Sequence, residues 1–326
     1  MTRSSVPPPV TAVMDAASAW LPARMADVES RLAELSAGYG PRLGEEAEAT
    51  LTAGGKRLRP ILVLMAAGDG AGDRAVRVAS AVEMVHMATL VHDDVLDGAP
   101  VRRGRPTVVA RSGRDRAVGV GDLLFSRAFA ELAVDGGEAE AAELSSASVA
   151  LALGELAQRH DAFDTSITEE RYLERCSLKT ARLFESACRL GRISSGKPGT
   201  EELASFGREI GLAFQLLDDV LDVTGPPERT GKARGTDLID GTVTLPLILA
   251  RGRDPGLESI ELRGLGRDAV ETVCDRIAAT GALGAVRDRA KHGIKRAKEI
   301  LDSPDFSGEE RELLGMIADG VVERYA

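Results

Sequence analysis

Two acidic clusters with the same spacing lie far apart in this chain, and they constrain its fold more than any other feature. The letters DDVLD occupy positions 93–97 and again positions 218–222. On a helix, positions i, i+1 and i+4 lie on one side, so each cluster brings its carboxylates together. Like charges repel at that distance, and the apolar pairs Leu90-Val91 and Leu216-Leu217 just before the clusters make desolvation costly. A fold that accepts both clusters must therefore supply a strong counter-charge.

Divalent cations that prefer oxygen ligands are the obvious counter-charge, because carboxylates are among their usual protein ligands. The candidate metal ligands are Asp93, Asp94, Asp97, Asp218, Asp219 and Asp222. The alternative is two acidic helix faces in contact with water. The apolar residues beside each cluster favour the metal site over that alternative, because a solvated face does not need them.

Composition and apolar spacing predict an all-α fold. Aromatic residues make up only 3% of the 326 residues, whereas Ala, Leu, Glu and Arg, which favour helices, are abundant. Apolar residues recur at three-to-four spacing in four segments, 120–133, 143–160, 168–192 and 201–223. We expect a flexible tail at residues 1–15 and one all-helical domain over residues 16–326, with both clusters facing a shared cavity.

Charge and cysteine usage narrow the class of protein. The net charge of −10 argues against a general surface for nucleic acid or anionic membrane. Cys176, Cys188 and Cys274 are odd in number and lack the spacing of metal ligands, so we expect free thiols in a reducing cytoplasm. The densest apolar run, residues 61–67, is far too short to span a membrane. These features are typical of a cytoplasmic enzyme.

Basic residues flank both acidic clusters in the sequence. Two glycines precede three cations in the segment GGKRLRP at 54–60, a combination that lets backbone amides and side chains approach an anion. An arginine-rich stretch at 102–105 follows the first cluster, Lys179 lies between the clusters, and Lys232 follows the second. Carboxylates for a metal and cations for phosphate oxygens together suit a diphosphate held through bridging Mg²⁺.

In its ordered motifs the chain resembles the trans-isoprenyl diphosphate synthases of the polyprenyl synthetase family, most of all the bacterial medium- and long-chain enzymes. The motifs are GGKRLRP (54–60), HMATLVHDDVLD (86–97), RRG (102–104), GD (121–122), KTA (179–181), FQLLDDVLD (214–222) and GKARGTDL (231–238). They follow the family order along the chain. The resemblance implies a single-domain antiparallel helical bundle around a deep central cavity, the isoprenoid synthase type, and a homodimer.

The resemblance also implies roles for individual residues. Both aspartate clusters would bind Mg²⁺, three ions per site with substrate present, and these ions would hold the diphosphate of an allylic primer. Isopentenyl diphosphate would be held by Lys56, Arg59, His86 and Arg103. The allylic diphosphate would contact Arg102, Lys179, Thr180, Gln215 and Lys232. Ionisation of the allylic C–O bond, attack by the double bond of isopentenyl diphosphate and loss of a proton would give a trans product.

One position departs from the family pattern. Relatives commonly have a lysine where this chain has Thr242, and a threonine supplies no charge there. We therefore expect the departure to affect primer binding more than activity. If activity were absent, Thr242 would be the first residue to test.

Product length is predicted from the helix that contains the first cluster. A helical turn rises about 5.4 Å, close to the span of one isoprene unit. Thr89, Ala88 and Val85 therefore mark successive depths below the diphosphate, and none of them is a bulky aromatic residue. We expect a product longer than fifteen carbons. Phe125 or Phe129 would close the tunnel at greater depth, with ordinary core packing as the alternative for each.

Other functions remain open at this point. A geranylgeranyl diphosphate synthase would stop at twenty carbons. A class I terpene cyclase shares one DDxxD motif, but its second metal motif is normally of another type, and it lacks a segment like GGKRLRP. A catalytically silent partner subunit typically loses aspartates, whereas this chain keeps all six. Glu83 and His86 have the spacing of di-iron ligands, but no second Glu-x-x-His pair occurs in the sequence.

Overall fold

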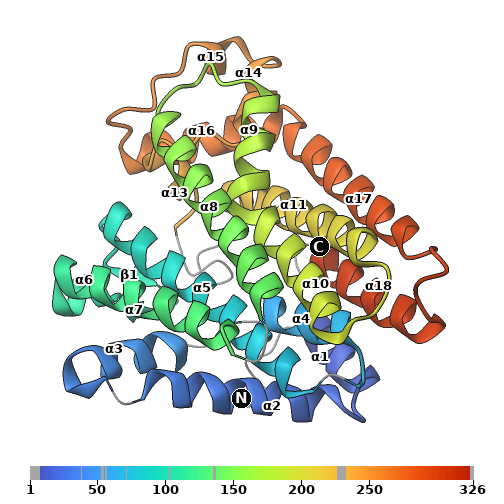
Figure 1. Ribbon diagram of the computed structural model, residues 1–326. Helices are drawn as coiled ribbons and strands as arrows, with labels where there is room; N and C mark the ends of the chain where they lie inside the picture. Colours follow the sequence, from blue (N-terminus) through green and yellow to red (C-terminus); the bar gives the residue numbers. More distant parts are fainter. Residues whose placement is uncertain are drawn as a thin grey trace.

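The fold is a bundle of α-helices (Figure 1), and the prediction of an all-α class is confirmed. The computed structural model describes residues 8–37, 39–52, 55, 57–70, 72–102, 104–134, 137–225 and 233–323. The first half contains α1 (Pro8–Ala16), α2 (Leu21–Ser36), α3 (Gly40–Thr52), α4 (Leu58–Ala67), α5 (Asp73–Asp97), β1 (Val101–Arg102), β2 (Arg105–Pro106), α6 (Val108–Ser112), α7 (Arg114–Leu132) and α8 (Glu138–His160). The second half contains α9 (Glu169–Cys176), the π-helical turn η2 (Ser177–Ala181), α10 (Arg182–Ser195), α11 (Thr200–Thr224), α13 (Thr236–Ile239), α14 (Leu245–Arg251), α15 (Pro255–Glu258), α16 (Arg267–Ala279), α17 (Ala282–Ile300) and α18 (Gly308–Glu323). Strands β1 and β2 pair antiparallel as a minimal hairpin directly after α5.

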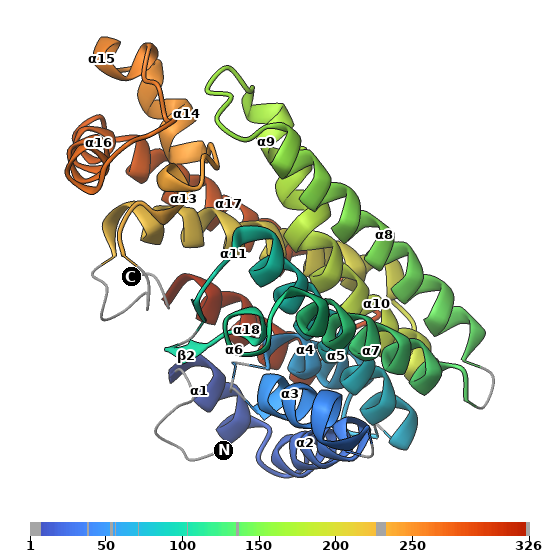
Figure 2. The same ribbon diagram turned by 90° about the vertical axis from the view of Figure 1, so that its left-hand side faces the viewer.

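Helix α10 lies at the centre of the bundle, where it contacts α4, α5, α8 and α11. Its side chains Leu183, Phe184 and Leu190 are buried, so α10 offers apolar surface to several neighbours at once. At Gly191 the helix comes so close to α4 that an added Cβ would lie 2.3 Å from the carbonyl oxygen of Val63. Figure 2 shows α8 on the outer side of this central helix.

Two helices of 25 residues each, α5 and α11, contain the acidic clusters in their last turns. Both helices pack on α10, and both clusters line one cleft near the ends of these helices. Gly98 ends α5 in the left-handed conformation, with φ 61°. Because glycine adopts that conformation at little cost, the chain can turn sharply into the β1–β2 hairpin directly after the first cluster.

The first and last helices of the described chain pack against each other, since α1 contacts α18 (Figure 1). Val13 and Ala17 are each only 2% exposed. They are four residues apart, so they lie on one side of α1 and its end. The stretch 1–15, expected as a flexible tail, thus contains a packed helix from Pro8 onward, because the C-terminal helix offers it an apolar partner surface.

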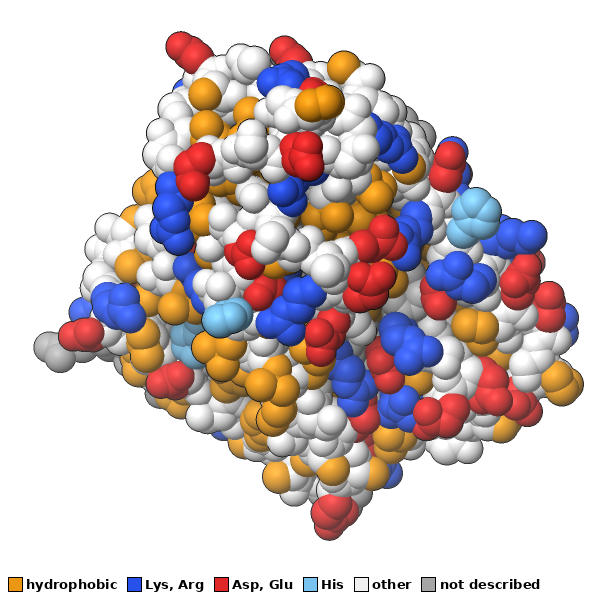
Figure 3. Space-filling model, turned by 90° about the horizontal axis from the view of Figure 1, so that it is seen from above, with side chains coloured by type: hydrophobic (Ala, Val, Ile, Leu, Met, Phe, Trp, Pro, Cys, Tyr) orange, Lys and Arg blue, Asp and Glu red, His pale blue; other side chains and the backbone are white. Residues whose placement is uncertain are grey.

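Acidic and basic side chains are interspersed on the surface. Figure 3 shows both kinds mixed with apolar side chains on the face seen from above. Some join neighbouring helices, as Arg296 of α17 does by pairing with Glu209 of α11 at 2.8 Å. Such exposed pairs contribute at most about 1 kcal/mol each. None of the described helices is both long enough and apolar enough to cross a membrane.

Candidate active site

A cleft of about 400 Å³ lies at the ends of α5 and α11. Its walls come from these helices, from α8, α9 and η2, and from the segment 237–244. The carboxylates that line it are Asp93, Asp97, Asp218, Asp219, Asp237 and Asp240. The other polar and charged residues that line it are Gln158, Arg102, Arg159, Tyr172, Arg175, Lys179, Thr180, Gln215, Thr242 and Thr244. The fold therefore brings aspartates of both clusters to one site.

Each aspartate of the first cluster has a basic neighbour. Nζ of Lys179 lies 3.9 Å from Asp93, whereas Nε of Arg102 donates to the buried Asp94 at 2.7 Å. Asp97 is more exposed and accepts a hydrogen bond from Arg159. Burial raises the pKa of Asp93 to about 6, although the charge of Lys179 acts in the opposite direction. A carboxylate held in this way binds a proton more readily than an exposed one.

In the second cluster, Asp219 is the most enclosed carboxylate. It is 2% exposed and accepts hydrogen bonds from the hydroxyl of Tyr172 at 2.5 Å and from Nε2 of Gln215 at 2.7 Å. Burial, and then the nearby Asp237, raise the pKa of Asp219 well above its usual range. Burial and the charge of Asp219 likewise raise the pKa of Tyr172, so its hydroxyl stays a donor. Asp222 lies outside the cleft lining and accepts from the backbone N–H of Asp237 at 3.3 Å, which ties the 237–244 segment to α11.

The π-helical turn η2 brings Lys179 and Thr180 to the cleft. Two glycines make room for it: an added Cβ at Gly154 of α8 would lie 2.6 Å from the backbone nitrogen of Lys179, and one at Gly211 of α11 would lie 2.8 Å from Cα of Ala181. Held between these helices, Thr180 donates to Oε1 of Gln215 at 2.7 Å. π-Helical turns inside α-helices are common at functional sites, and here the turn orients the one Lys-Thr pair that the sequence motif predicts.

Lys179 also bonds Glu155 of α8, which in turn accepts from Nε of Arg159 at 2.8 Å. Although burial acts to raise it, the charges and hydrogen bonds of Lys179 and Arg159 lower the pKa of Glu155. Glu155 is therefore a carboxylate that stays charged and holds two cations at the edge of the cleft.

Two predicted substrate-binding residues, Arg59 and His86, lie away from this cleft, and three others fall outside the described residues. Arg59 of α4 stacks on the ring of Phe184, with Cζ 4.6 Å from the ring centroid, and His86 is half-buried on α5. Neither lines the cleft. The other three, Lys56, Arg103 and Lys232, lie outside the described residues. Their roles remain predictions.

The residues predicted to limit chain length lie on α5 and α7, which pack along each other. Val85 and Ala88 are fully buried, and Thr89 is half-buried. Phe125 and Phe129 are half-buried on α7. None of the five lines the described cleft, so their part in setting product length also remains a prediction.

Several residues at the cleft are not among the sequence predictions. Tyr172, Arg175 and Cys176 precede Lys179 by seven, four and three residues, and all four line the cleft. That spacing marks one face of a helix, so the position of Lys179 could have pointed to them. Asp237 belongs to a predicted motif but was not itself expected at the site. Its placement depends on a tertiary contact with Asp222 that no local pattern reveals.

The donor set fits a hard divalent cation. Within the described residues, no three His, Cys, Asp or Glu side chains are close enough together to form a metal site by themselves. Several of the aspartates bond a protein donor instead, as Asp94 does with Arg102 and Asp219 with Tyr172. The available ligands are nonetheless carboxylate oxygens on two facing helices, which suit Mg²⁺ or Ca²⁺ better than softer metals. An anion bridging such cations would find Lys179 and Arg102 at the same cleft.

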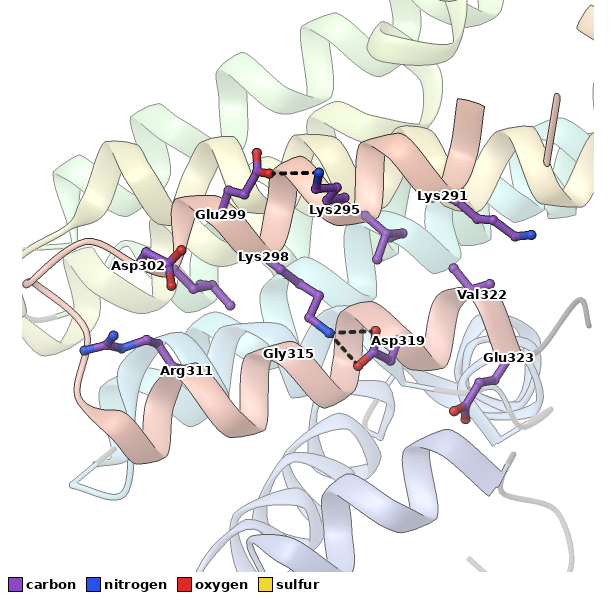
Figure 4. A pocket seen from close by; sticks show the side chains of 12 residues that line it. Lys291, Lys295, Lys298, Glu299, Asp302, Arg311, Gly315, Asp319, Val322 and Glu323 are labelled. Carbon is purple, nitrogen blue, oxygen red and sulfur yellow. Dashed lines mark hydrogen bonds and ion pairs between the residues drawn. The ribbon is translucent and has the colours of Figure 1, made fainter. Parts of the chain in front are cut away.

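A second groove, of about 670 Å³, lies between α17 and α18 (Figure 4). Its charged side chains pair largely with one another: Lys298 lies 2.9 Å from Asp319, and Lys295 lies 3.7 Å from Glu299. None of the predicted site residues lines it. The smaller cleft is the candidate site, because buried carboxylates with raised pKa values gather there.

The chain is similar to known prenyl diphosphate synthases in sequence and in structure. A family model described as polyprenyl synthetase matches residues 41–273. The heptaprenyl diphosphate synthase component 2 of Geobacillus stearothermophilus is 38% identical over 286 residues, which cover 86% of this chain and 89% of that protein. The octaprenyl diphosphate synthase of Escherichia coli is 38% identical over 277 residues, with 82% and 85% covered. The crystal structure of a polyprenyl synthase from Caulobacter crescentus, complexed with calcium and isoprenyl diphosphate, matches with a TM-score of 0.90 and 36% identity over 97% of this chain and 98% of that one.

Proposed function

The chain belongs to the polyprenyl synthetase family, and on that premise we propose that it condenses isopentenyl diphosphate with an allylic diphosphate to make an all-trans polyprenyl diphosphate longer than fifteen carbons. One observation supports the site of this reaction above all others. Carboxylates from both DDVLD clusters line a single cleft together with Arg102 and Lys179. Such a cleft offers metal ligands and phosphate-binding cations side by side.

The metal ligands are Asp93, Asp94, Asp97, Asp218, Asp219 and Asp222. We propose Mg²⁺ as the cofactor, with three ions per site when substrate is bound. The calcium and isoprenyl diphosphate in the Caulobacter crescentus protein support a divalent-cation site in this fold. Bound ions neutralise the diphosphate charge and so make it a better leaving group.

The protein's own residues hold the two substrates. The allylic diphosphate is bound by Arg102, Lys179, Thr180, Gln215 and Lys232. Isopentenyl diphosphate is bound by Lys56, Arg59, His86 and Arg103. Lys179 is held in place by Glu155, so its charge is available as negative charge develops on the leaving diphosphate. The allylic C–O bond breaks, the double bond of isopentenyl diphosphate attacks the resulting cation, and the departed diphosphate takes a proton from the adjacent carbon to complete the new trans alkene.

We also propose a homodimer in the cytoplasm, in which each copy forms one helical domain that includes α1. Exposed apolar side chains on α8 support self-association: Val149, Leu153 and Leu156 are 58%, 52% and 65% exposed. They are four and then three residues apart, so they share one face of the helix. The three cysteines are buried free thiols, which agrees with a reducing compartment.

Incubation of the purified protein with Mg²⁺, an allylic primer and labelled isopentenyl diphosphate tests the proposal. We expect elongated products beyond fifteen carbons, and no products after chelation of the metal. Asp219→Asn is expected to lower the rate by at least about 100-fold, because even residues that only support metal ligands cost up to that factor. Asp254→Asn removes an aspartate paired with Arg276 outside the cleft and serves as the matched control.

Other outcomes would replace the proposal by a defined alternative. Products that stop at twenty carbons would identify a geranylgeranyl diphosphate synthase. Cyclic hydrocarbon from the primer alone would identify a terpene cyclase. A folded protein that turns over only with a second, different chain would identify a silent partner subunit.

A further inference from the structure

Arg175 of α9 is a buried cation at the wall of the cleft. Its side chain is 3% exposed, and its NH2 donates to the backbone carbonyl of Val243 at 2.5 Å. Its NH1 is buried and has no hydrogen-bond partner. The carboxylate of Asp161 lies 3.8 Å from this NH1, beyond hydrogen-bonding distance. A buried guanidinium with an unused hydrogen-bond donor destabilises the folded protein, which suggests that this donor has a function at the site.

Three other cations line the cleft in the described part of the chain, and each has a hydrogen-bonded carboxylate. Arg102 bonds Asp94, Arg159 bonds Asp97, and Lys179 bonds Glu155. Arg175 differs because the carboxylate nearest to it is shared with another arginine. Asp161 accepts at 3.1 Å from Nε of Arg171, which is the more exposed of the two arginines. Arg171 also pairs with Glu174 at 3.2 Å, whereas Arg175 makes no hydrogen bond to either carboxylate.

The contact with Val243 puts this charge beside the residue that follows Thr242, and Thr242 also lines the cleft. Thr242 contributes no charge to this part of the chain. We propose that Arg175 is a positioning residue for the diphosphate: it holds the 241–244 segment through the Val243 carbonyl and supplies at the cleft wall a positive charge that Thr242 cannot supply. This inference rests on the proposed function and assigns the charge to the allylic diphosphate, because Thr180 and Lys179 border the same part of the cleft.

The test uses calorimetric binding of inorganic pyrophosphate with Mg²⁺, together with KM values for both substrates. We expect Arg175→Gln to weaken pyrophosphate binding and to raise the KM for the allylic diphosphate, each about tenfold, the size of one lost charge-assisted contact. The KM for isopentenyl diphosphate should change less than about twofold. Adding Thr242→Lys to Arg175→Gln should restore the allylic KM to within about threefold, because the lysine returns the charge.

Arg251→Gln is the matched control, since Arg251 also donates to a backbone carbonyl, that of Glu258, but outside the cleft. A double variant no better than Arg175→Gln, or an equal rise in both KM values, would overturn the proposal. If Arg175→Gln fails to fold, Arg175→Lys takes its place. Retained pyrophosphate binding in Arg175→Lys supports the proposal that the positive charge at this position binds the diphosphate, and a tenfold loss of binding overturns it. If Arg175→Gln weakens pyrophosphate binding as expected but the wild-type protein elongates no primer, the result would count against the proposed function and not against the role of Arg175.

Discussion

Burial shifts the pKa values of Asp93 and Asp219 in the same direction. Burial raises the pKa of Asp93 to about 6 and raises the pKa of Asp219 as well. In the unfolded chain both carboxyls return to ordinary values of about 3.9. The folded protein therefore binds protons more tightly at these two positions. Folding stability must then fall as the pH rises from about 4 through the folded pKa values.

We predict that the metal-free protein loses thermal stability between about pH 5 and pH 8. The contribution of Asp93 is at most about 3 kcal/mol. The opposite effect of Glu310 is complete below this range: despite its burial, hydrogen bonds from Ser307, Lys197 and Arg192 lower its pKa to about 2. Mg²⁺ with pyrophosphate should raise Tm more at the alkaline end, where the carboxylates are charged. Scanning calorimetry at constant ionic strength measures both effects.

Asp93→Asn provides the control for this prediction, because an amide does not titrate. The variant should show a smaller loss of Tm on the acidic side of the range, between about pH 5 and pH 7. A wild-type Tm that climbs steadily toward pH 8 would contradict the assigned direction of both pKa shifts.

Ala88 is the residue at which product length can be tested. It is fully buried on α5, five residues before Asp93. We predict that Ala88→Phe shortens the product to about fifteen carbons, since a ring one turn below the diphosphate blocks further elongation. Chromatography of labelled products measures the chain length, and Tm shows whether the fold survives. An active, folded variant with an unchanged product distribution would mean that the wall lies elsewhere.

At the scale of the helices, apolar spacing predicts which segments are helical, whereas tertiary packing determines where a helix departs from regular α-helical geometry. Apolar spacing predicts helices over 120–133, 143–160 and 201–223, and these segments lie almost wholly within α7, α8 and α11. The same rule predicts a helix over 168–192, but the segment contains the π-helical turn η2 between α9 and α10. A period of three to four residues does not register one inserted residue. The turn depends on the space left by α8 and α11, which only the assembled bundle determines.

The residues of the candidate site were likewise predictable only in part. The DDVLD pattern itself implies converging carboxylates, and four of the six predicted aspartates line the cleft. Tyr172 and Arg175 were missed because their roles depend on contacts with α11 and with the 241–244 segment. Local spacing identifies the residues that share a helix face, but it does not identify what that face meets.

A substitution at Gly154 tests whether close packing against α8 holds the η2 turn in place. We predict that Gly154→Ala destabilises the protein by about 1–3 kcal/mol, because the new methyl overlaps the backbone of Lys179. It should also raise the KM for the allylic substrate, since Lys179 and Thr180 must move with the turn. Gly284→Ala on the exposed side of α17 is the matched control: its added methyl meets nothing within 4 Å, so the change should be neutral or stabilising. Equal Tm values for the two variants would refute the close-packing account.

At the scale of the whole molecule, the bundle brings the ends of two long helices together. Helices α5 and α11 both pack on a common partner, α10, although the chain between them contains α7, α8 and α9. The cleft therefore depends on the entire arrangement and not on one supersecondary unit. Helix α8 has one face at the cleft and another at the molecular surface. Its Glu155 holds Lys179 at the cleft, whereas Leu153 and Leu156 are exposed. Any partner that covers α8 would lie next to the residues that hold the site.

A second copy of the chain is the partner we predict for α8. Leu153→Glu combined with Leu156→Glu should convert the dimer to a monomer, because two charges would have to be desolvated in the interface. Light scattering or native mass spectrometry gives the oligomeric state. Val101→Glu, at a comparably exposed apolar residue of β1, is the control and should stay dimeric. A wild-type monomer, or a double variant that remains a dimer, would contradict this use of α8. Since Glu155 lies on the same helix, we also expect the monomeric variant to lose affinity for the allylic substrate, with a smaller change for isopentenyl diphosphate.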